Sequence, residues 1–238
     1  MEQLHNGFTL EICQGGFPLS TDSVALAAFA RLPKNATVLD LGSGCGTLGV
    51  LLCAKDPACR VTGIELDADA HDAAIANAER NGICHRLVSI CGDISHIATL
   101  VPQGSFSCCI SNPPYFSPDS PQSKTVPLAR AEALCSLDTL MAAASRALRY
   151  GGDFFLVHRP ERLAQLCAAA CAHGMEPKRL QLLRHRTDGP ITLVLVQCRK
   201  GGKPGLIWEE ESLYDSQGAP TAYYRRLYHM EATPEVTP

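Results

Sequence analysis

The stretch ATVLDLGSGCGTLGVLLCAK, residues 36–55, decides the fold. Its first part, 36–41, is a short apolar run typical of a buried strand. Its last part, 47–55, has the composition and length of a helix. The two are joined by GSGCG, whose glycines permit backbone conformations that other residues avoid. A strand, a glycine loop and a helix in this order form the first unit of an open α/β sheet that binds a nucleotide.

The same alternation continues along the chain. Strand-like runs at 60–66, 87–91, 106–111 and 153–158 alternate with helical patterns at 69–81, 131–149 and 161–173. Two further strand-like runs, 180–185 and 191–198, are joined by a short turn with Asp188-Gly189-Pro190, which predicts an antiparallel hairpin. We therefore predict an α/β fold: a Rossmann-like, seven-stranded, mostly parallel sheet with helices on both faces and an antiparallel C-terminal hairpin.

The chain is predicted to hold one large α/β domain with two flanking segments. Residues 1–35 form a lead-in, then a helix that Ser20-Thr21-Asp22 begins and Pro33 closes. We expect this helix to cap the ligand site. Residues 36–200 form the α/β domain, and residues 201–238 form a C-terminal extension with a disordered tail.

Composition excludes several classes of protein. No stretch of the 238 residues approaches the ~20 apolar residues of a membrane span, and the first residues lack a signal-peptide pattern, so we expect a cytoplasmic protein without membrane contact. The 12 cysteines show no C-x2-C spacing, so we expect reduced, mostly buried thiols and no metal site. A net charge of −3 argues against coating nucleic acid through bulk charge.

A local basic patch remains compatible with RNA binding. The last third of the chain is the candidate, and ordinary surface charge is the alternative interpretation. Its basic residues are Lys178, Arg179, Arg184, His185, Arg186, Arg199, Lys200, Lys203, Arg225 and Arg226.

The glycine loop alone does not distinguish two kinds of nucleotide ligand. Gly44, Gly46 and Gly49 form a G-x-G-x-x-G pattern, and Glu65 follows about 20 residues later, as in NAD sites. In both cases small residues let the backbone approach the ligand, and a carboxylate after the second strand binds a ribose diol.

Three further features favour S-adenosylmethionine over NAD. Asp40 ends the first strand, where a carboxylate suits an ammonium group better than a pyrophosphate. Asp93 follows the third strand and can accept a hydrogen bond from an adenine amino group. Asn112-Pro-Pro-Tyr115 follows the fourth strand and has no role in hydride transfer. The predicted cofactor-binding residues include Asp40, Gly42, Gly44, Gly46, Glu65, Asp93 and Asn112.

The Asn-Pro-Pro-Tyr segment suits methylation of an exocyclic amino nitrogen, whose delocalised lone pair makes it a poor nucleophile. The Asn112 side-chain carbonyl and the Pro113 backbone carbonyl can each accept one N–H of that group. Pro113 and Pro114 fix the backbone, and Tyr115 offers a face on which an extruded base can stack. We predict that Asn112, Pro113, Pro114 and Tyr115 carry catalysis. No strong general base is required.

Over nearly its full length the chain resembles the bacterial tRNA1(Val) (adenine-37-N6)-methyltransferase family. The matching stretches are STDSVALAAFA, VLDLGSGCGTLGVLL, GIELD, SNPPY, LVHRPERL and LYDSQGAPTAYYRRLYH. The resemblance implies N6-methylation of an adenine in RNA, most directly tRNA, with S-adenosylhomocysteine as the product from the donor. It also implies that Thr21 and Asp22 lie near the methionyl end of the cofactor.

Some features leave alternatives open. Where the family leads us to expect Arg-His-Glu, the chain has Arg130-Ala131-Glu132. Arg130, His158 and Arg159 are candidate substrate contacts, and residues 116–127 form a loop of open role. The same Asn-Pro-Pro-Tyr occurs in protein glutamine N5-methyltransferases, and a related segment occurs in ribosomal RNA guanine-N2 methyltransferases. A catalytically idle scaffold that binds S-adenosylmethionine is the alternative that is not an enzyme.

Overall fold

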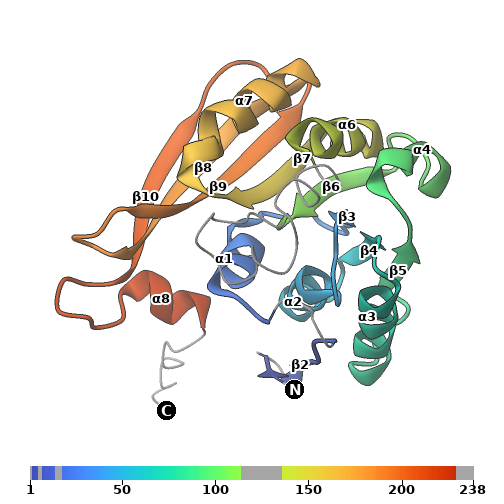
Figure 1. Ribbon diagram of the computed structural model, residues 1–238, viewed down its shortest axis with the longest axis horizontal. Helices are drawn as coiled ribbons and strands as arrows, with labels where there is room; N and C mark the ends of the chain where they lie inside the picture. Colours follow the sequence, from blue (N-terminus) through green and yellow to red (C-terminus); the bar gives the residue numbers. More distant parts are fainter. Residues whose placement is uncertain (1, 5–6, 14–17, 114–135, 229–238) are drawn as a thin grey trace, which may run out of the picture.

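The main sheet has eight strands in the order β10-β8-β9-β7-β6-β3-β4-β5, of which only β9 is antiparallel to its neighbours (Figure 1). The computed structural model describes residues 2–4, 7–13, 18–113 and 136–228. The strands are β3 Thr37–Leu41, β4 Arg60–Glu65, β5 Leu87–Cys91, β6 Phe106–Ser111, β7 Leu148–His158, β8 Met175–Arg186, β9 Ile191–Lys200 and β10 Ile207–Tyr214. A separate pair consists of β1 Glu2–Gln3 and β2 Thr9–Leu10.

Helices cover both faces of this sheet, as the sequence predicts (Figure 1). They are α1 Thr21–Phe29, α2 Thr47–Lys55, α3 Ala68–Arg80, α4 Ile97–Leu100, α6 Leu137–Ala147, α7 Leu163–Ala172 and α8 Ala222–Leu227, with short 3-10 turns at Ile94–His96 and Pro160–Arg162. In the described ranges, no helix is long and apolar enough to cross a membrane.

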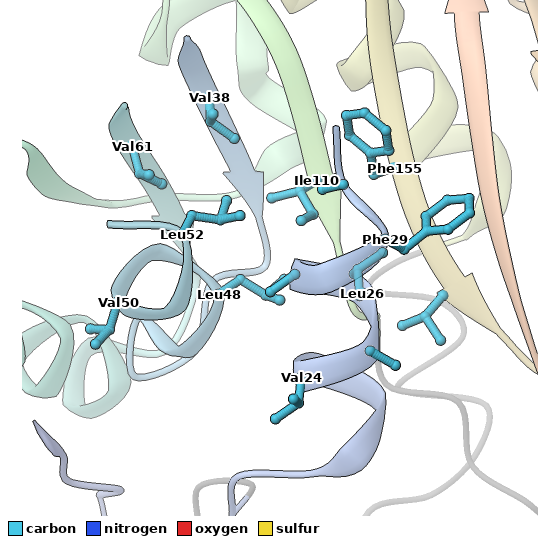
Figure 2. Close-up of a cluster of buried hydrophobic side chains, with 14 of the residues drawn as sticks. Val24, Leu26, Phe29, Val38, Leu48, Val50, Leu52, Val61, Ile110 and Phe155 are labelled. Atoms are coloured by element: carbon cyan, nitrogen blue, oxygen red, sulfur yellow. The ribbon is translucent and has the colours of Figure 1, made fainter. Parts of the chain in front are cut away.

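Two apolar clusters, one on each face, hold these layers together. Side chains alternate between the faces along a strand, so Val38 and Ile110 join α1 and α2 on one face (Figure 2). The helix α8 packs against the same cluster. Leu39 and Cys109 pack with α4, α6 and α7 on the other face. Phe29 of α1 packs edge-on against Phe155 of β7, with ring centroids 6.3 Å apart. The helix that precedes the sheet in sequence is therefore fixed to its middle strands.

The predicted fold class is confirmed, and the number of strands is corrected from seven to eight. The additional strand is β10, which pairs in parallel with β8 from Ile207 to Tyr214. Its sequence, IWEEESLY, lacks the apolar alternation of a half-buried strand, and most of its side chains are exposed. The strand forms because its backbone pairs with β8, which the local sequence does not predict. The predicted disordered tail, residues 231–238, lies outside the described residues.

The helix predicted over 131–149 is corrected at its end. The helix α6 ends at Ala147, and β7 begins at once at Leu148, which pairs with Phe106. Gly151 and Gly152 lie within β7, at the point where its pairing with β6 shifts register between Phe106 and Cys108. A Cβ at Gly152 would lie 2.9 Å from the carbonyl oxygen of Ser107. Residues 131–135, at the start of the predicted helix, lie outside the described residues.

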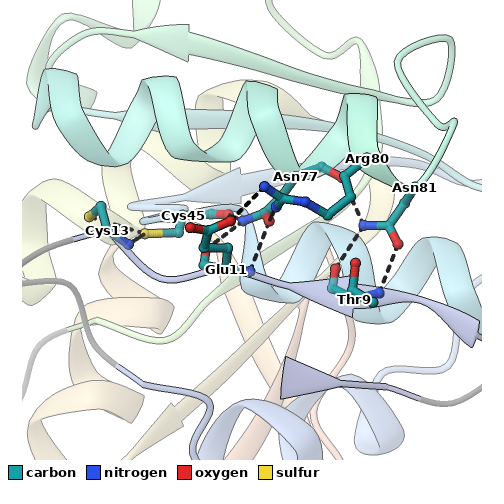
Figure 3. A network of polar contacts seen from close by, with 7 residues as sticks. All are labelled: Thr9, Glu11, Cys13, Cys45, Asn77, Arg80 and Asn81. Atoms are coloured by element: carbon teal, nitrogen blue, oxygen red, sulfur yellow. Dashed lines mark hydrogen bonds and ion pairs between the residues drawn. The ribbon is translucent and has the colours of Figure 1, made fainter. Parts of the chain in front are cut away.

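The segment before α1 is held along α3 by two asparagines (Figure 3). Asn77 accepts from the backbone N–H of Glu11 and donates to its carbonyl, at 2.9 and 2.8 Å. Asn81 makes the equivalent pair with Thr9, with both distances 2.8 Å. Asn77 also donates to the carbonyl of Cys45 in the glycine loop at 3.0 Å. The lead-in is therefore tied to the loop that it precedes.

Candidate functional site

The predicted site residues come together because the carboxyl ends of the parallel strands lie at one edge of the sheet. Asp40 is one residue from the end of β3, and Glu65 ends β4. Asn112 follows β6, which is the other neighbour of β3. Asp40 pairs with Gly63 on one side and with Ile110 on the other, so the three ends are adjacent.

The glycine loop between β3 and α2 depends on left-handed backbone conformations. Gly42, Gly44 and Gly46 have φ values of +74°, +53° and +78°, which side chains other than glycine rarely adopt. A Cβ at Gly42 or Gly44 would meet nothing within 4 Å. These two glycines are therefore required by the turn, and they leave room beside the backbone where a ligand can approach.

Asp40 is the most unusual group in the site. Its side chain is fully buried, and neither carboxyl oxygen has a hydrogen-bond partner in the part of the chain that the structure describes. Burial, and then the negative charge of Glu65, raises the pKa of Asp40 to about 8. A buried carboxyl without partners is costly unless a ligand completes it. The site thus fits a ligand with a cationic or hydrogen-bond-donating group, as the ammonium of S-adenosylmethionine would supply.

Glu65 already supports the loop from the second strand. One oxygen accepts from the backbone N–H of Gly44 at 2.7 Å, and the other accepts from the N–H of Asp67 at 2.9 Å. Each carboxylate oxygen has two lone pairs, so Glu65 retains capacity to accept hydroxyl protons. The geometry is compatible with the predicted ribose contact.

Asp93 follows β5 and begins the short turn Ile94–His96, where its side chain accepts from the N–H of Ser95 at 2.8 Å. This backbone hydrogen bond lowers the pKa of Asp93. The group is therefore an ionised acceptor at the same edge of the sheet, as a contact to an adenine amino group requires.

Asn112 contacts a residue that the sequence analysis did not select. Its side-chain N–H donates to the hydroxyl of Ser23 in α1 at 3.0 Å. Cys108 and Ile110 point to the face that α1 covers, and alternation along the strand directs Asn112 to the same side. Ser23 directly follows Thr21 and Asp22 in the sequence. This position is the only feature of the sequence that indicates a role for Ser23 in the site. Pro113 is buried beside Asn112, whereas Pro114 and Tyr115 lie outside the described residues.

Thr21 and Asp22 begin α1, close to this contact. The Thr21 hydroxyl lies 3.1 Å from the Tyr228 hydroxyl, which ties the start of α1 to the end of α8. Burial raises the pKa of Asp22, and the positive charge of Arg159 acts in the opposite direction. The start of α1 thus lies between the site and the C-terminal helix.

The candidate substrate contacts do not form one group. His158 is buried at the end of β7, and burial, followed by the charge of Arg162, lowers its pKa to about 4. By alternation with Leu156 it leaves the sheet on the face opposite to Asn112. Arg159 donates to the carbonyl of Thr192 at 3.3 Å. Arg130 and the loop 116–127 lie outside the described residues.

The basic residues of the last third are largely engaged within the protein. Arg184, Arg186, Arg199 and Arg226 form ion pairs with Glu210, Asp188, Asp153 and Glu211, respectively. Arg179 is buried and donates to the carbonyl of Phe29. This pattern agrees with structural charge pairing more than with a free basic surface.

Comparisons with known proteins agree with this geometry. The family model described as methyltransferase small domain matches residues 21–166. A tRNA1(Val) (adenine(37)-N6)-methyltransferase from Photobacterium profundum is 30% identical over 185 residues, covering 76% of this chain and 77% of the relative. One of the same name from Shewanella halifaxensis is 34% identical over 170 residues, covering 71% and 68%.

A solved structure shows the same fold at low sequence identity. The crystal structure of a predicted O-methyltransferase from Agrobacterium tumefaciens superposes with a TM-score of 0.73 and 20% identity, covering 88% of this chain and 96% of that one.

Proposed function

Because the chain belongs to the methyltransferase small domain family and to the family of the tRNA1(Val) (adenine(37)-N6)-methyltransferases, we propose that it methylates N6 of an adenine in tRNA. The predicted family is thereby confirmed, and with it the enzyme class, an S-adenosylmethionine-dependent methyltransferase. By analogy with the names of its relatives, adenine 37 of a valine tRNA is the proposed target. The observation that carries the proposal is the adjacency of the unpartnered Asp40 and the oriented Asn112.

The donor side of the site consists of charged groups on β3, β4 and β5. When bound, S-adenosylmethionine supplies an electrophilic methyl group on a positively charged sulfur. Asp40 would pair with the ammonium through two oxygens that have no hydrogen-bond partner among the described residues. Glu65 would accept from the ribose hydroxyls, and Asp93 would accept from the adenine amino group. Gly42 and Gly44 let the backbone approach the ligand.

The acceptor side orients the amino group that receives the methyl. The side-chain carbonyl of Asn112 accepts one N–H, and the backbone carbonyl of Pro113 accepts the other, which aims the nitrogen lone pair at the methyl group. Stacking on the base and rigidity of the segment remain the predicted roles of Tyr115 and Pro114, which lie outside the described residues. Holding both partners in this geometry supplies much of the acceleration. The proton leaves after the methyl has bonded, when the nitrogen is positively charged and acidic.

We also propose that residues 1–35 cap the donor site. The contacts of the described residues support this role: the Cys13 N–H donates to the sulfur of Cys45 in the glycine loop at 3.3 Å, and Ser23 contacts Asn112. Thr21 and Asp22 would then lie at the methionyl end of the donor. His158 and Arg159 stay proposed substrate contacts, and the cytoplasm stays the proposed location.

The proposal is tested by methyl transfer from labelled S-adenosylmethionine to RNA from a strain that lacks the gene. Nucleosides are then separated and identified by mass spectrometry. We expect N6-methyladenosine in the tRNA fraction, formed about 10²–10³ times more slowly with Asn112→Ala. Ser107→Ala is the matched control, because this buried serine lies on β6 far from the site.

Two results would contradict the proposal. Donor binding without label in any RNA fraction would exclude RNA as the substrate. Label in a protein glutamine, or N2-methylguanosine in ribosomal RNA, would identify one of the alternative enzymes instead. Full function in a cell with Asn112→Ala would favour a scaffold role.

A further inference from the structure

The proposed reaction requires the side-chain amide of Asn112 to face the base in one of two orientations. The amide is nearly symmetric in shape, but its oxygen accepts hydrogen bonds whereas its nitrogen donates them. With the oxygen toward the base, the amide accepts an N–H of the amino group. Turned by half a rotation, it would place N–H against N–H and leave the amino group unoriented.

Ser23 contacts the end of the amide that must not face the base. The Nδ2 of Asn112 donates to the Oγ of Ser23 at 3.0 Å, although the two residues are 89 positions apart. Ser23 is only 6% exposed, so water does not readily replace this contact. With Nδ2 held by α1, Oδ1 is directed away from α1.

A serine hydroxyl by itself does not select an orientation, because it can donate to Oδ1 as well as accept from Nδ2. Ser20 offers an acceptor for the proton of Ser23, although either hydroxyl of this pair can donate. Its Oγ lies 3.4 Å from the Oγ of Ser23. When Ser23 donates its proton to Ser20, only its lone pairs remain for Asn112, and these accept from Nδ2. The hydroxyl pair thus favours one orientation of the amide.

We infer that Ser23, with its proton directed to Ser20, is a positioning residue that keeps the Oδ1 of Asn112 toward the amino group to be methylated. The inference rests on the proposed function for its consequence in catalysis. Ser23 acts through Asn112 and touches no reacting atom. Ser20 has a second task, since it also caps α1 by accepting from the N–H of Ser23 at 3.3 Å.

Ser23→Ala removes the contact without weakening the helix, because alanine is the better helix former. We expect kcat to fall about tenfold, the effect of one lost hydrogen bond in an oriented site. The KM for RNA and the Kd for the donor should stay within about twofold. Ser23→Thr keeps the hydroxyl and should restore most of kcat, and Ser107→Ala should leave it unchanged.

A double-mutant cycle tests whether Ser23 acts through Asn112. In the Asn112→Ala background, Ser23→Ala should cause no further loss, because its target is gone. A tenfold loss in both backgrounds would overturn the inference. So would a raised KM with unchanged kcat, or a Ser23→Thr variant as slow as Ser23→Ala.

The amide can also be observed without methyl transfer. In the ¹⁵N-labelled protein, the side-chain amide protons of Asn112 should exchange slowly, and Ser23→Ala should make them exchange at least about tenfold faster. Equal exchange rates in both proteins would overturn the inference whatever the substrate is. Conversely, wild-type protein that shows slow exchange but methylates no RNA would contradict only the proposed function.

Discussion

The two proposed halves of the site would stabilise their ligands by different means. The donor half, on β3, β4 and β5, uses carboxylates, and its central group, Asp40, is buried without a partner among the described residues. The proposed acceptor half, after β6 and at the start of α1, uses neutral groups, the amide of Asn112 and the hydroxyl of Ser23.

This difference corresponds to two tasks. A cationic donor is attracted by a charge that the fold leaves uncompensated, so affinity and its pH dependence belong to the donor half. A neutral amino group carries no net charge that could be attracted, so the acceptor half must act by orienting that group through hydrogen bonds. We therefore expect substitutions in the donor half to change Kd, and substitutions in the acceptor half to change kcat.

The largest expected effect is that of Asn112→Ala on the chemical step. Loss of an oriented polar partner that acts in the transition state costs about 10²–10³ in kcat. Donor affinity should fall far less than kcat, because Asn112 is only one of the predicted donor contacts and Asp40, Glu65 and the glycine loop are intact. Single-turnover methyl transfer and calorimetric titration of the donor measure the two quantities. A loss of donor affinity as large as the loss of kcat would show that the halves are not separate.

The converse substitution is Asp40→Asn. We expect the Kd for S-adenosylmethionine to rise about 100-fold, since breaking a buried ion pair costs roughly 3 kcal/mol. Activity at saturating donor should stay near that of the wild type. In the free protein the change removes a buried carboxyl that has no hydrogen-bond partner among the described residues, so the melting temperature should not fall. A destabilised variant with wild-type affinity would contradict this assignment.

Donor binding should weaken as the pH falls below about 8. Burial, and then Glu65, raises the pKa of Asp40 to about 8 in the free protein, so at lower pH the carboxyl must release its proton before it pairs with the ammonium. The limiting slope is about tenfold in Kd per pH unit. Titration of the donor between pH 6 and 9 measures it, and Asp40→Asn should flatten the profile. A flat wild-type profile would contradict the role of Asp40.

The effect that should change activity least concerns the stability of the protein and His158, on the face of the sheet opposite to Asn112. Burial and the charge of Arg162 lower the pKa of His158 from 6.5 to about 4, so the unfolded chain binds a proton first as the pH falls. Stability is then full above about pH 6.5 and is lost progressively down to about pH 4, by roughly 2–3 kcal/mol.

Thermal unfolding at pH 7.5 and pH 5 tests this linkage in the wild type and in His158→Asn. Asparagine keeps an acceptor for the N–H of Arg159, which His158 Nδ1 accepts at 2.8 Å. The variant should lose less stability at pH 5. Equal losses in both proteins would mean that other groups titrate.

The sequence by itself determined the donor half. Asp40, Gly42, Gly44 and Glu65 lie within one strand–loop–helix–strand unit, and their conformations depend on near neighbours: an apolar run makes β3, and glycines make the left-handed turn. The unit therefore has a pattern that can be read locally. The succession of the later strands along the chain, up to β9, followed from the same alternation and from the turn at Gly189.

Only the tertiary structure decided the rest. Ser23 meets Asn112 across 89 positions because α1 packs on the face toward which β6 directs that residue. The strand β10 exists because β8 offers an open edge, although its own sequence, with three adjacent glutamates, does not favour a strand. Similarly, β7 starts at Leu148 because Phe106 pairs with it. Each outcome depends on hydrogen bonds and burial between distant segments, for which no local pattern is required.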